Sequence, residues 1–181
     1  MALRKQTIII LASSLFLSAA CHVSNRARVA QFLSGKRAAV FVFLAPDCPL
    51  SQSYTLTLNR LHEQFQPKGI GFYGVFSGGA GDKKGMGDFV TKYKVAFAPL
   101  PDRDFVLADF FGATKTPEVF AVDAGGTVFY QGAIDNWAPD LGQHRAVVTQ
   151  QYLFNALNSL LDNRTAQLEK TEAVGCFIER L

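Results

Sequence analysis

One stretch constrains the fold of this chain more than any other: the pattern of a buried strand that stops at a turn and continues into a helix. Residues 37–44 read RAAVFVFL, a run of β-branched and aromatic side chains typical of a strand buried on both faces of a sheet. The run ends at the turn APDCP, residues 45–49, which carries Cys48. Residues 51–65 then repeat apolar side chains at helical spacing. The sequence therefore predicts strand, turn and helix, with a cysteine at the turn.

The rest of the chain continues this alternation. The expected elements are a strand over 70–76, a mobile Gly-rich loop over 77–87, a helix around 86–93, a helical turn over 104–111, a β-hairpin of 118–123 and 127–132, and a helix over 145–161. Strands joined through a helix pair in parallel by a right-handed crossover, whereas a hairpin is antiparallel. We therefore expect one α/β domain over 37–162, with a central mixed β-sheet flanked by helices.

The N-terminus has the pattern of an export signal over residues 1–20. Arg4 and Lys5 precede an uncharged, mostly apolar run over 7–20, which is short for a membrane-spanning helix. The run ends in Ser-Ala-Ala before Cys21, which resembles a bacterial lipobox whose cysteine is lipidated. A lipid anchor at Cys21, plain cleavage and an uncleaved anchor remain open. All three predict an extracytoplasmic domain, with residues 21–36 as a linker.

The charge balance gives no reason to expect nucleic-acid binding. The chain has 18 basic and 15 acidic residues. Without Arg4 and Lys5, 16 basic residues remain against 15 acidic ones, whereas nucleic-acid-binding proteins carry a basic excess. The three histidines are scattered in the sequence without the spacing of metal ligands. We expect no metal site and no bound cofactor.

Removal or lipidation of the leader leaves two cysteines for the domain, Cys48 and Cys176. Disulfides persist outside the cytoplasm, so this pair can form a bond there. Cys176 lies in an apolar segment, residues 173–178, at the end of a polar tail over 163–181. Such a segment is expected to dock on the domain.

Several motifs resemble a known group of proteins. The turn APDCPLS, residues 45–51, is similar to the active-site turn of bacterial extracytoplasmic redoxins near the TlpA-like and AhpC/TSA-like proteins. The segment of Thr116, Pro117 and Glu118 resembles their cis-proline segment, and residues 116–135 resemble redoxin sequences in which the hairpin is followed by Gly-x-Ile-Asp. The Gly-Cys pair ending at Cys176 resembles a C-terminal Gly-Cys of some members. The resemblance covers roughly residues 37–178 and implies a thioredoxin-like fold.

The chain also departs from the better-known members of this fold. Thioredoxins carry Cys-x-x-Cys, whereas here Ser51 stands at the second cysteine position. Peroxiredoxins carry Thr or Ser three residues before their cysteine, where this chain has Ala45. Copper-delivering proteins of the Sco type carry a second cysteine where this chain has Gln52. Each departure weakens one function: ordinary thioredoxin exchange, peroxidase chemistry or copper delivery.

Redox chemistry at Cys48 is the function that these residues favour. Pro49 suits the first position of a helix, and free amides at a helix start stabilise a thiolate. We expect the sulfur of Cys48 to be open to solvent, with Ser51 as a hydrogen-bond partner. A cis bond between Thr116 and Pro117 would bring backbone beside the sulfur to pair with an extended substrate.

Three functions remain open from the sequence. The first is a thiol-disulfide oxidoreductase acting on extracytoplasmic protein thiols or disulfides, with Cys48 as nucleophile, Cys176 as resolving cysteine and Pro117 shaping the substrate site. The second is a non-catalytic binding or assembly module in which Cys48 and Cys176 form a permanent disulfide. The third, a peroxidase, is disfavoured by Ala45.

Overall fold

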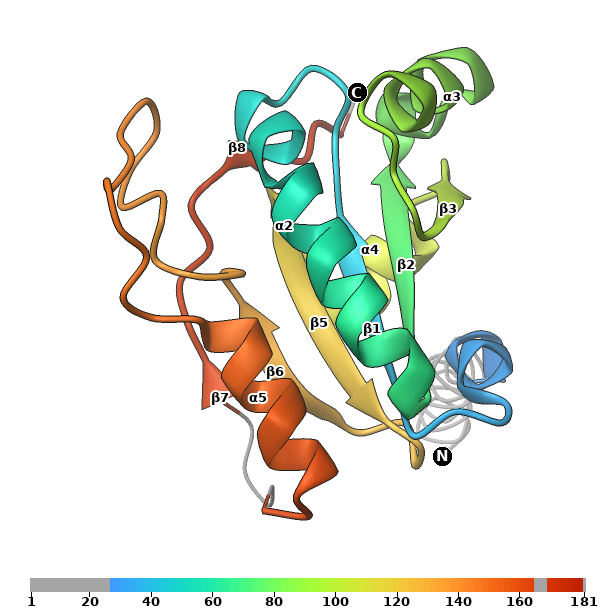
Figure 1. Ribbon diagram of the computed structural model, residues 1–181. Helices are drawn as coiled ribbons and strands as arrows, with labels where there is room; N and C mark the ends of the chain where they lie inside the picture. The colour runs from blue at the N-terminus through green and yellow to red at the C-terminus, as the bar shows by residue number, and fades with distance from the viewer. Residues whose placement is uncertain (1–26, 165–168, 181) are drawn as a thin grey trace, which may run out of the picture.

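The structure is a computed structural model that describes residues 27–164 and 169–180 (Figure 1). The strands are β1 (Ala38–Phe43), β2 (Ile70–Ser77), β3 (Ala98–Asp102), β4 (Lys115–Thr116), β5 (Glu118–Asp123), β6 (Val128–Gly132), β7 (Glu169–Lys170) and β8 (Cys176–Phe177). The helices are α2 (Pro49–Phe65), α3 (Lys83–Lys92), α4 (Val106–Phe111) and α5 (Tyr152–Leu161), with short 3-10 turns over Gln66–Lys68 and Gly78–Gly81. Residues 27–33 are also helical.

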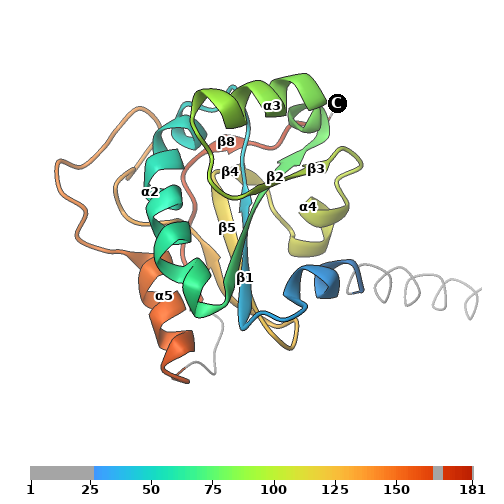
Figure 2. The same cartoon turned by 45° about the vertical axis from the view of Figure 1, so that its right-hand side comes forward.

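Six strands form one mixed sheet in the order β3-β2-β1-β5-β6-β7. The pairs β1–β2, β2–β3 and β6–β7 are parallel, and β1–β5 and β5–β6 are antiparallel. The two remaining strands, β4 and β8, pair with each other near the upper end of this sheet (Figure 2). The predicted mixed sheet and its flanking helices are confirmed.

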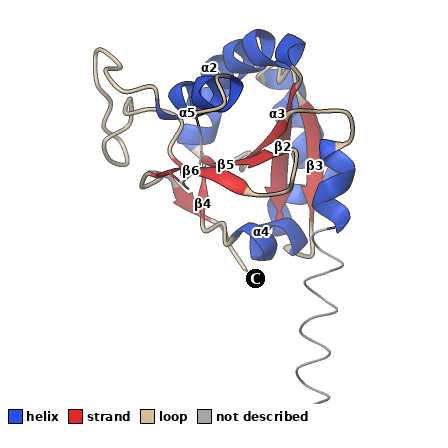
Figure 3. Cartoon of the chain, turned by 90° about the horizontal axis from the view of Figure 1, so that it is seen from below, coloured by secondary structure: helices blue, strands red, loops and turns tan. Residues whose placement is uncertain are grey.

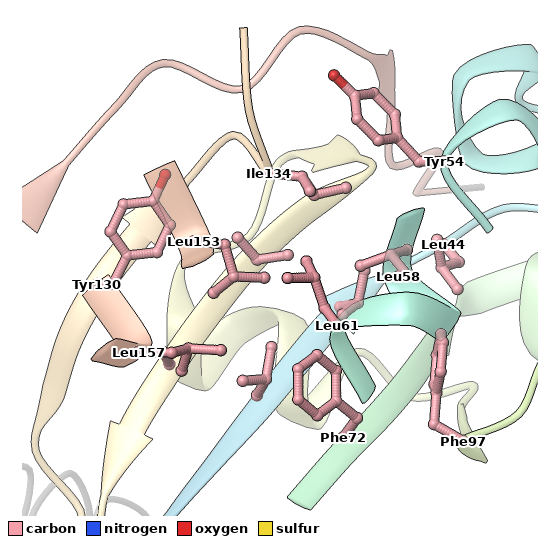
Figure 4. Close-up of a cluster of buried hydrophobic side chains, with 14 of the residues drawn as sticks. Leu44, Tyr54, Leu58, Leu61, Phe72, Phe97, Tyr130, Ile134, Leu153 and Leu157 are labelled. Atoms are coloured by element: carbon pink, nitrogen blue, oxygen red, sulfur yellow. The ribbon is translucent and has the colours of Figure 1, made fainter. Parts of the chain in front are cut away.

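Helices cover both faces of the sheet. Viewed from below, α2, α3 and α5 lie on one side and α4 on the other (Figure 3). On the first side, α2 and α5 bury leucines over the sheet, including Leu58, Leu61, Leu153 and Leu157 (Figure 4). On the second side, Phe111 of α4 and Val29 of the 27–33 helix share a separate cluster. The fold is therefore a three-layer sandwich around the sheet.

Strand β1 is the centre of that sandwich, as its sequence predicts. All six of its residues are fully buried. Because side chains alternate along a strand, Val40 and Val42 join the cluster under α2, while Phe41 and Phe43 join the cluster under α4. Burial of each of these side chains contributes roughly 1.5–3 kcal/mol, so β1 fixes the position of the turn that follows it.

The predicted helix over 145–161 begins later than expected, at Tyr152. The backbone before it bonds to the segment after β6 instead of to itself. The amide of Arg145 donates to Trp137, and the amide of Asn136 donates to Gln150. These two backbone hydrogen bonds hold residues 145–150 in an irregular loop, although their apolar spacing continues that of the helix.

Strand β3 is absent from the sequence-based expectations. Its sequence, APLPD, contains Pro99 and Pro101, and proline normally argues against a strand. The strand lies at the edge of the sheet, beside β2 alone, where a missing amide donor is tolerated. The Gly-rich loop over 77–87 is also more ordered than expected, since it contains the Gly78–Gly81 turn and the start of α3.

Both terminal segments pack on the domain. Within the expected linker over 21–36, residues 27–33 form a helix that buries Val29 and Leu33. In the C-terminal tail, β7 extends the main sheet and β8 pairs with β4, so the apolar segment docks as predicted. The export signal over 1–20 and Cys21 lie outside the described residues. None of the helices in the described part of the chain is long and apolar enough to cross a membrane.

Candidate functional site

Cys48 is the residue that begins helix α2. It occupies the N-cap position with extended backbone angles, φ −81° and ψ 115°, and Pro49 follows at the first helical position. The turn before it is closed by the amide of Cys48, which donates to the carbonyl of Ala45 at 3.2 Å. The side chain of Gln52 donates to the carbonyl of Pro46 at 2.8 Å. The turn thus holds the sulfur at the positive end of the helix dipole.

The segment around Pro117 faces this turn, as the resemblance to redoxins implies. The bond between Thr116 and Pro117 is cis. Sγ of Cys48 donates a hydrogen bond to the carbonyl oxygen of Thr116 at 3.0 Å. The buried carboxylate of Glu118 accepts from the amides of Thr114 and Lys115 at 3.0 and 3.2 Å. Glu118 therefore fixes the backbone that presents Thr116 to the sulfur.

The C-terminal tail brings Cys176 to the same place. Strand β8 pairs antiparallel with β4, with Cys176 opposite Thr116. The Thr116 hydroxyl donates to the carbonyl of Cys176 at 3.4 Å. Cys48 and Cys176 are both free thiols, and Cys176 lies near enough to Cys48 to act on its pKa. The two cysteines are therefore direct neighbours across the β4 backbone.

Their surroundings move the two thiol pKa values in opposite directions. Burial raises the pKa of Cys48, but hydrogen bonds from Cys176, from the amides of Ser51 and Cys176 and from the Ser51 hydroxyl outweigh it, so this pKa is lowered. For Cys176, burial, the hydrogen bond it gives to Cys48, and the charges of Cys48 and Asp47 raise the pKa to about 12. The pair therefore ionises first at Cys48, while Cys176 keeps its proton.

Ser51 supports Cys48 from the first turn of α2. Its side chain is fully buried, and its oxygen accepts a hydrogen bond from the amide of Ala45 at 3.2 Å. A hydrogen bond from the Ser51 side chain also helps to lower the pKa of Cys48. Ser51 is therefore a hydrogen-bond donor at the position where thioredoxins carry their second cysteine.

One expectation about the site is wrong: Cys48 is not open to solvent. Its exposed fraction is 1%, and the docked tail with Cys176 covers it. A cavity of about 620 Å³ nevertheless reaches the cysteine. Its walls include the turn over 45–48, residues 77–80 at the end of β2 and in the turn that follows, Arg103, Phe105 and residues 176–179 of the tail.

The structure gathers the sequence-predicted site residues in one place, apart from Cys21. Pro49 and Ser51 follow Cys48 on α2, and Thr116 and Pro117 lie opposite. Glu118 and Gly175 belong to the motifs that resemble redoxins, but the sequence does not predict what they do. The Glu118 carboxylate accepts from the amides of Thr114 and Lys115, and Gly175 lies against the Thr116 carbonyl, where a Cβ would be 2.2 Å from the oxygen. Within residues 27–164 and 169–180 there is no group of three or more Asp, Glu, His or Cys side chains arranged to hold a metal ion.

Solved structures share this fold. An uncharacterized conserved protein from Geobacillus kaustophilus is 24% identical, with a TM-score of 0.71 over 81% of this chain and 78% of that protein. A secreted disulfide oxidoreductase of Mycobacterium tuberculosis, homologous to E. coli DsbE, is 22% identical, with a TM-score of 0.52 over 70% and 84% of the two chains. The DsbF protein of MTB is 27% identical, with a TM-score of 0.51 over 70% and 81%.

The sequence itself matches a protein family, although no curated protein matches the chain. The match to the AhpC/TSA family covers residues 17–131, more than half of the 181 residues. It includes β1, the Cys48 turn, α2 and the cis-proline segment. With its thioredoxin-like fold, this chain is a redoxin that belongs to the AhpC/TSA family.

Proposed function

We propose that this redoxin is an extracytoplasmic thiol-disulfide oxidoreductase in which Cys48 is the nucleophile and Cys176 the resolving cysteine. The carrying observation is that both cysteines meet at Thr116: Sγ of Cys48 donates to its carbonyl oxygen at 3.0 Å, and Cys176 lies opposite it in the β4–β8 pair. The lowered pKa of Cys48 and the raised pKa of Cys176 agree with this arrangement. The thiolate is the attacking species in thiol-disulfide exchange, so Cys48 attacks first.

The reaction transfers two electrons from the protein to a substrate disulfide. The Cys48 thiolate attacks one sulfur of that disulfide, a Cys48–substrate bond forms, and the other substrate sulfur leaves with the electron pair as a thiolate. Cys176 then loses its proton and attacks the Cys48 sulfur. The second substrate thiolate is released and a Cys48–Cys176 disulfide remains. The reverse sequence oxidises a substrate dithiol.

The neighbour relation of Cys48 and Cys176 supports the resolving step. The pairing of Cys176 with Thr116, whose carbonyl accepts from Sγ of Cys48, supports an attack by Cys176 that needs no large movement of β8. Its high pKa keeps Cys176 protonated while Cys48 carries negative charge. When Cys48 enters a mixed disulfide that charge disappears, which lowers the pKa of Cys176 and favours its attack. This arrangement therefore favours attack by Cys48 first and attack by Cys176 second.

The burial of Cys48 favours a second candidate function, a binding or assembly module with a permanent Cys48–Cys176 disulfide. A covered cysteine pair in an oxidising compartment is typical of a structural bond as well as of a redox couple. The two functions differ in reduction potential, because structural disulfides lie below about −300 mV and exchange couples lie closer to the poise of the compartment.

The test is the reduction potential of the Cys48–Cys176 couple. We would use a Cys21→Ser background, so that the only thiols left are the two at the site, and equilibrate the chain in dithiol redox buffers before alkylation and mass measurement. A value above about −300 mV, together with reduction of a protein disulfide such as that of insulin, supports exchange. A lower value, with no turnover, would establish the structural disulfide instead.

Single-cysteine variants assign the two roles. Cys176→Ser should accumulate a mixed disulfide between Cys48 and the substrate, because the resolving thiol is missing. Cys48→Ser should form none. If both variants accumulate the same amount of mixed disulfide with the substrate, Cys48 is not the specific nucleophile.

The extracytoplasmic location rests on the leader pattern over 1–20 and on the lipobox-like Cys21. A structural neighbour, the Mycobacterium tuberculosis disulfide oxidoreductase, is a secreted protein. Fractionation of cells that express the chain, with Cys21→Ser as the matched variant, tests both points. Loss of membrane association in the variant is the result expected for a lipid anchor.

A further inference from the structure

The C-terminal tail is bound to the body of the domain at two places, one before and one after residues 172–175. It runs from β7 to β8 along the left side of the view in Figure 1. At the far end, β8 pairs with β4 and sets Cys176 opposite Thr116. At the near end, the amide of Thr171 donates to the carbonyl of Gln131 at 2.9 Å, directly after the β6–β7 pair. A short segment with both ends bound therefore determines where Cys176 lies.

The side chain of Thr171 closes a ring of hydrogen bonds with β6 and the segment after it. Its Oγ1 accepts from the amide of Ala133 at 2.9 Å and lies 2.6 Å from Oη of Tyr130. Tyr130 donates its single hydroxyl hydrogen to the carbonyl of Ala133, so Thr171 donates to Tyr130. Burial raises the pKa of Tyr130, so its hydroxyl keeps the hydrogen that the ring needs. The three residues thus satisfy one another.

The backbone of Thr171 also lies directly on Gly132, the last residue of β6. A Cβ on Gly132 would be 1.9 Å from the carbonyl oxygen of Thr171 and 2.6 Å from its Oγ1. The φ of Gly132 is +130°, a conformation that residues with a side chain rarely adopt. Both observations require glycine at 132, and both hold the tail close against β6.

The part of the tail that follows is also packed on the domain. Ala173 is 5% exposed, and Val174 packs against the cluster under α2. A Cβ on Gly175 would lie 2.2 Å from the carbonyl oxygen of Thr116. Beyond Cys176, Ile178 packs against the cluster under α4. The tail therefore follows one path across the domain, and this path begins at the hydrogen-bonded ring.

We infer that Thr171 is a positioning residue for the resolving step, because its ring of hydrogen bonds fixes the start of the path that brings Cys176 to Cys48. The inference rests on the proposed function and adds a residue on which the rate of its second step depends. Thr171 lies 5 residues before Cys176, whereas α5, the last described helix before the tail, ends 15 residues before it, at Leu161. Without the ring, the tether of Cys176 is about three times longer. Effective concentration falls with roughly the −3/2 power of tether length, so the attack by Cys176 should slow about fivefold.

One reaction measures the two steps of the exchange separately. One equivalent of the symmetric disulfide of thionitrobenzoate is added to the reduced full chain with Cys21→Ser. The Cys48 thiolate attacks one sulfur of the reagent, a Cys48–thionitrobenzoate disulfide forms, and a coloured thiolate leaves with the electron pair. Cys176 then loses its proton to the buffer and attacks the Cys48 sulfur. The Cys48–Cys176 disulfide forms and a second coloured thiolate leaves. The first release is bimolecular and the second unimolecular, so each has its own rate constant.

Variants of Thr171 test its role in the second release. Thr171→Val removes the hydroxyl and should slow the second release about fivefold, whereas Thr171→Ser keeps the hydroxyl and should restore the parent rate. Thr149→Val is the matched control: its hydroxyl accepts from Asn136 at 2.8 Å within the loop before α5, so the second release should not change. A second release as fast in Thr171→Val as in the parent would overturn the inference.

The reduction potential gives a readout that a purely structural role of Thr171 would not move. A fivefold loss of effective concentration raises the potential of the Cys48–Cys176 couple by about 20 mV, because a tenfold change in the equilibrium constant of a two-electron couple is about 30 mV. If Thr171→Val lowers the stability to urea of the reduced and oxidised chains equally and leaves the potential at the parent value, Thr171 does not position Cys176.

Tyr130→Phe opens the same ring from β6 and keeps the aromatic side chain. It should also slow the second release, and it replaces Thr171→Val if that variant does not fold. A parent rate in Tyr130→Phe would contradict the ring as the device that holds the tail.

The same reaction distinguishes this inference from the proposed function. If the parent chain gives no first release, Cys48 is not an exchange nucleophile and both proposals fail. If the parent gives both releases but neither Thr171→Val nor Tyr130→Phe slows the second, the exchange function stands and the positioning role of Thr171 is wrong.

Discussion

The carbonyl oxygen of Thr116 accepts a hydrogen bond from Sγ of Cys48 at 3.0 Å, although the two residues lie 68 positions apart in the sequence. As a thiol, Cys48 donates to this carbonyl, whereas hydrogen bonds from Cys176 and Ser51 lower its pKa and so favour the thiolate. The carbonyl of Thr116 therefore favours the protonated form of Cys48, and its other neighbours favour the thiolate. The following predictions concern these neighbours.

Removing the Cys176 thiol should raise the pKa of Cys48. The Cys176→Ala variant loses a hydrogen bond to the thiolate, and such bonds to charged groups contribute about 1.5 kcal/mol or more. We expect alkylation of Cys48 by iodoacetamide at neutral pH to slow by about tenfold, measured as a rate-pH profile in the Cys21→Ser background. Cys176→Ser keeps a donor and should slow it less. A profile identical to that of the parent would show that the Cys176 thiol does not stabilise the thiolate.

Ser51 and Ser53 form a matched pair on α2. Ser51→Ala removes a buried hydroxyl that accepts from the Ala45 amide and helps to lower the pKa of Cys48, so the pKa of Cys48 should rise and the free energy of unfolding should fall by about 1 kcal/mol. Ser53 donates to the carbonyl of Pro49 on the exposed side of the helix, so Ser53→Ala should change neither quantity appreciably. Alkylation profiles and urea unfolding measure both. Equal effects of the two substitutions would contradict the assigned role of Ser51.

The stability of the reduced chain should depend on pH through the two site thiols. The pKa of Cys48 is lowered from 9.0, so its contribution is present above pH 9.0 and is lost as the pH falls through the folded pKa. The pKa of Cys176 is raised from 9.0 to about 12, so its contribution is present below pH 9.0 and is lost as the pH rises toward about 12. The two contributions together are therefore largest near pH 9.0.

Urea unfolding under reducing conditions, across this pH range, checks that prediction. The relevant quantity is the difference in unfolding free energy between the reduced parent and the Cys48→Ala, Cys176→Ala double variant, since other groups titrate equally in both. A difference that stays flat with pH would mean that neither pKa is shifted on folding.

Glu118 should stabilise the backbone that carries Thr116. Glu118 is 7% exposed and its carboxylate accepts from two amides, so Glu118→Ala should lower the free energy of unfolding by about 2–4 kcal/mol. Glu118→Gln keeps an acceptor oxygen without the charge and should cost less. Glu172→Ala removes an exposed carboxylate and should cost less than about 1 kcal/mol. Urea denaturation ranks the three, and a Glu118→Ala cost no larger than that of Glu172→Ala would refute this role.

The sequence predicts the centre of this fold well because local and long-range preferences agree there. Strand β1 is apolar throughout, its turn carries Pro49 at the helix start, and the hairpin of β5 and β6 has a Gly-containing turn. Elements fixed by distant contacts are harder to predict. The start of α5 depends on backbone bonds between residues 134–137 and 145–153, and β3 forms despite Pro99 because β2 offers it an edge.

The candidate site also has features that the sequence predicts and features that it does not. The cysteine, serine and proline residues around it are recognisable in the sequence, because each chemical role belongs to a particular residue type. The burial of Cys48 cannot be recognised in the sequence, because it depends on a C-terminal tail more than a hundred residues away that packs over it. The same is true of Gly175, whose importance is evident only when the Thr116 carbonyl lies against it.

The prolines of β3 have a consequence for how the chain behaves at high concentration. Residues at alternate positions of a strand direct their amides to the same side of it. Pro99 and Pro101 have no amide hydrogen, so one side of β3 lacks two successive hydrogen-bond donors. The opposite rim is β7, which has two residues. Edge-to-edge pairing of the sheets of two molecules therefore has few backbone partners at either edge, which protects the folded chain against aggregation.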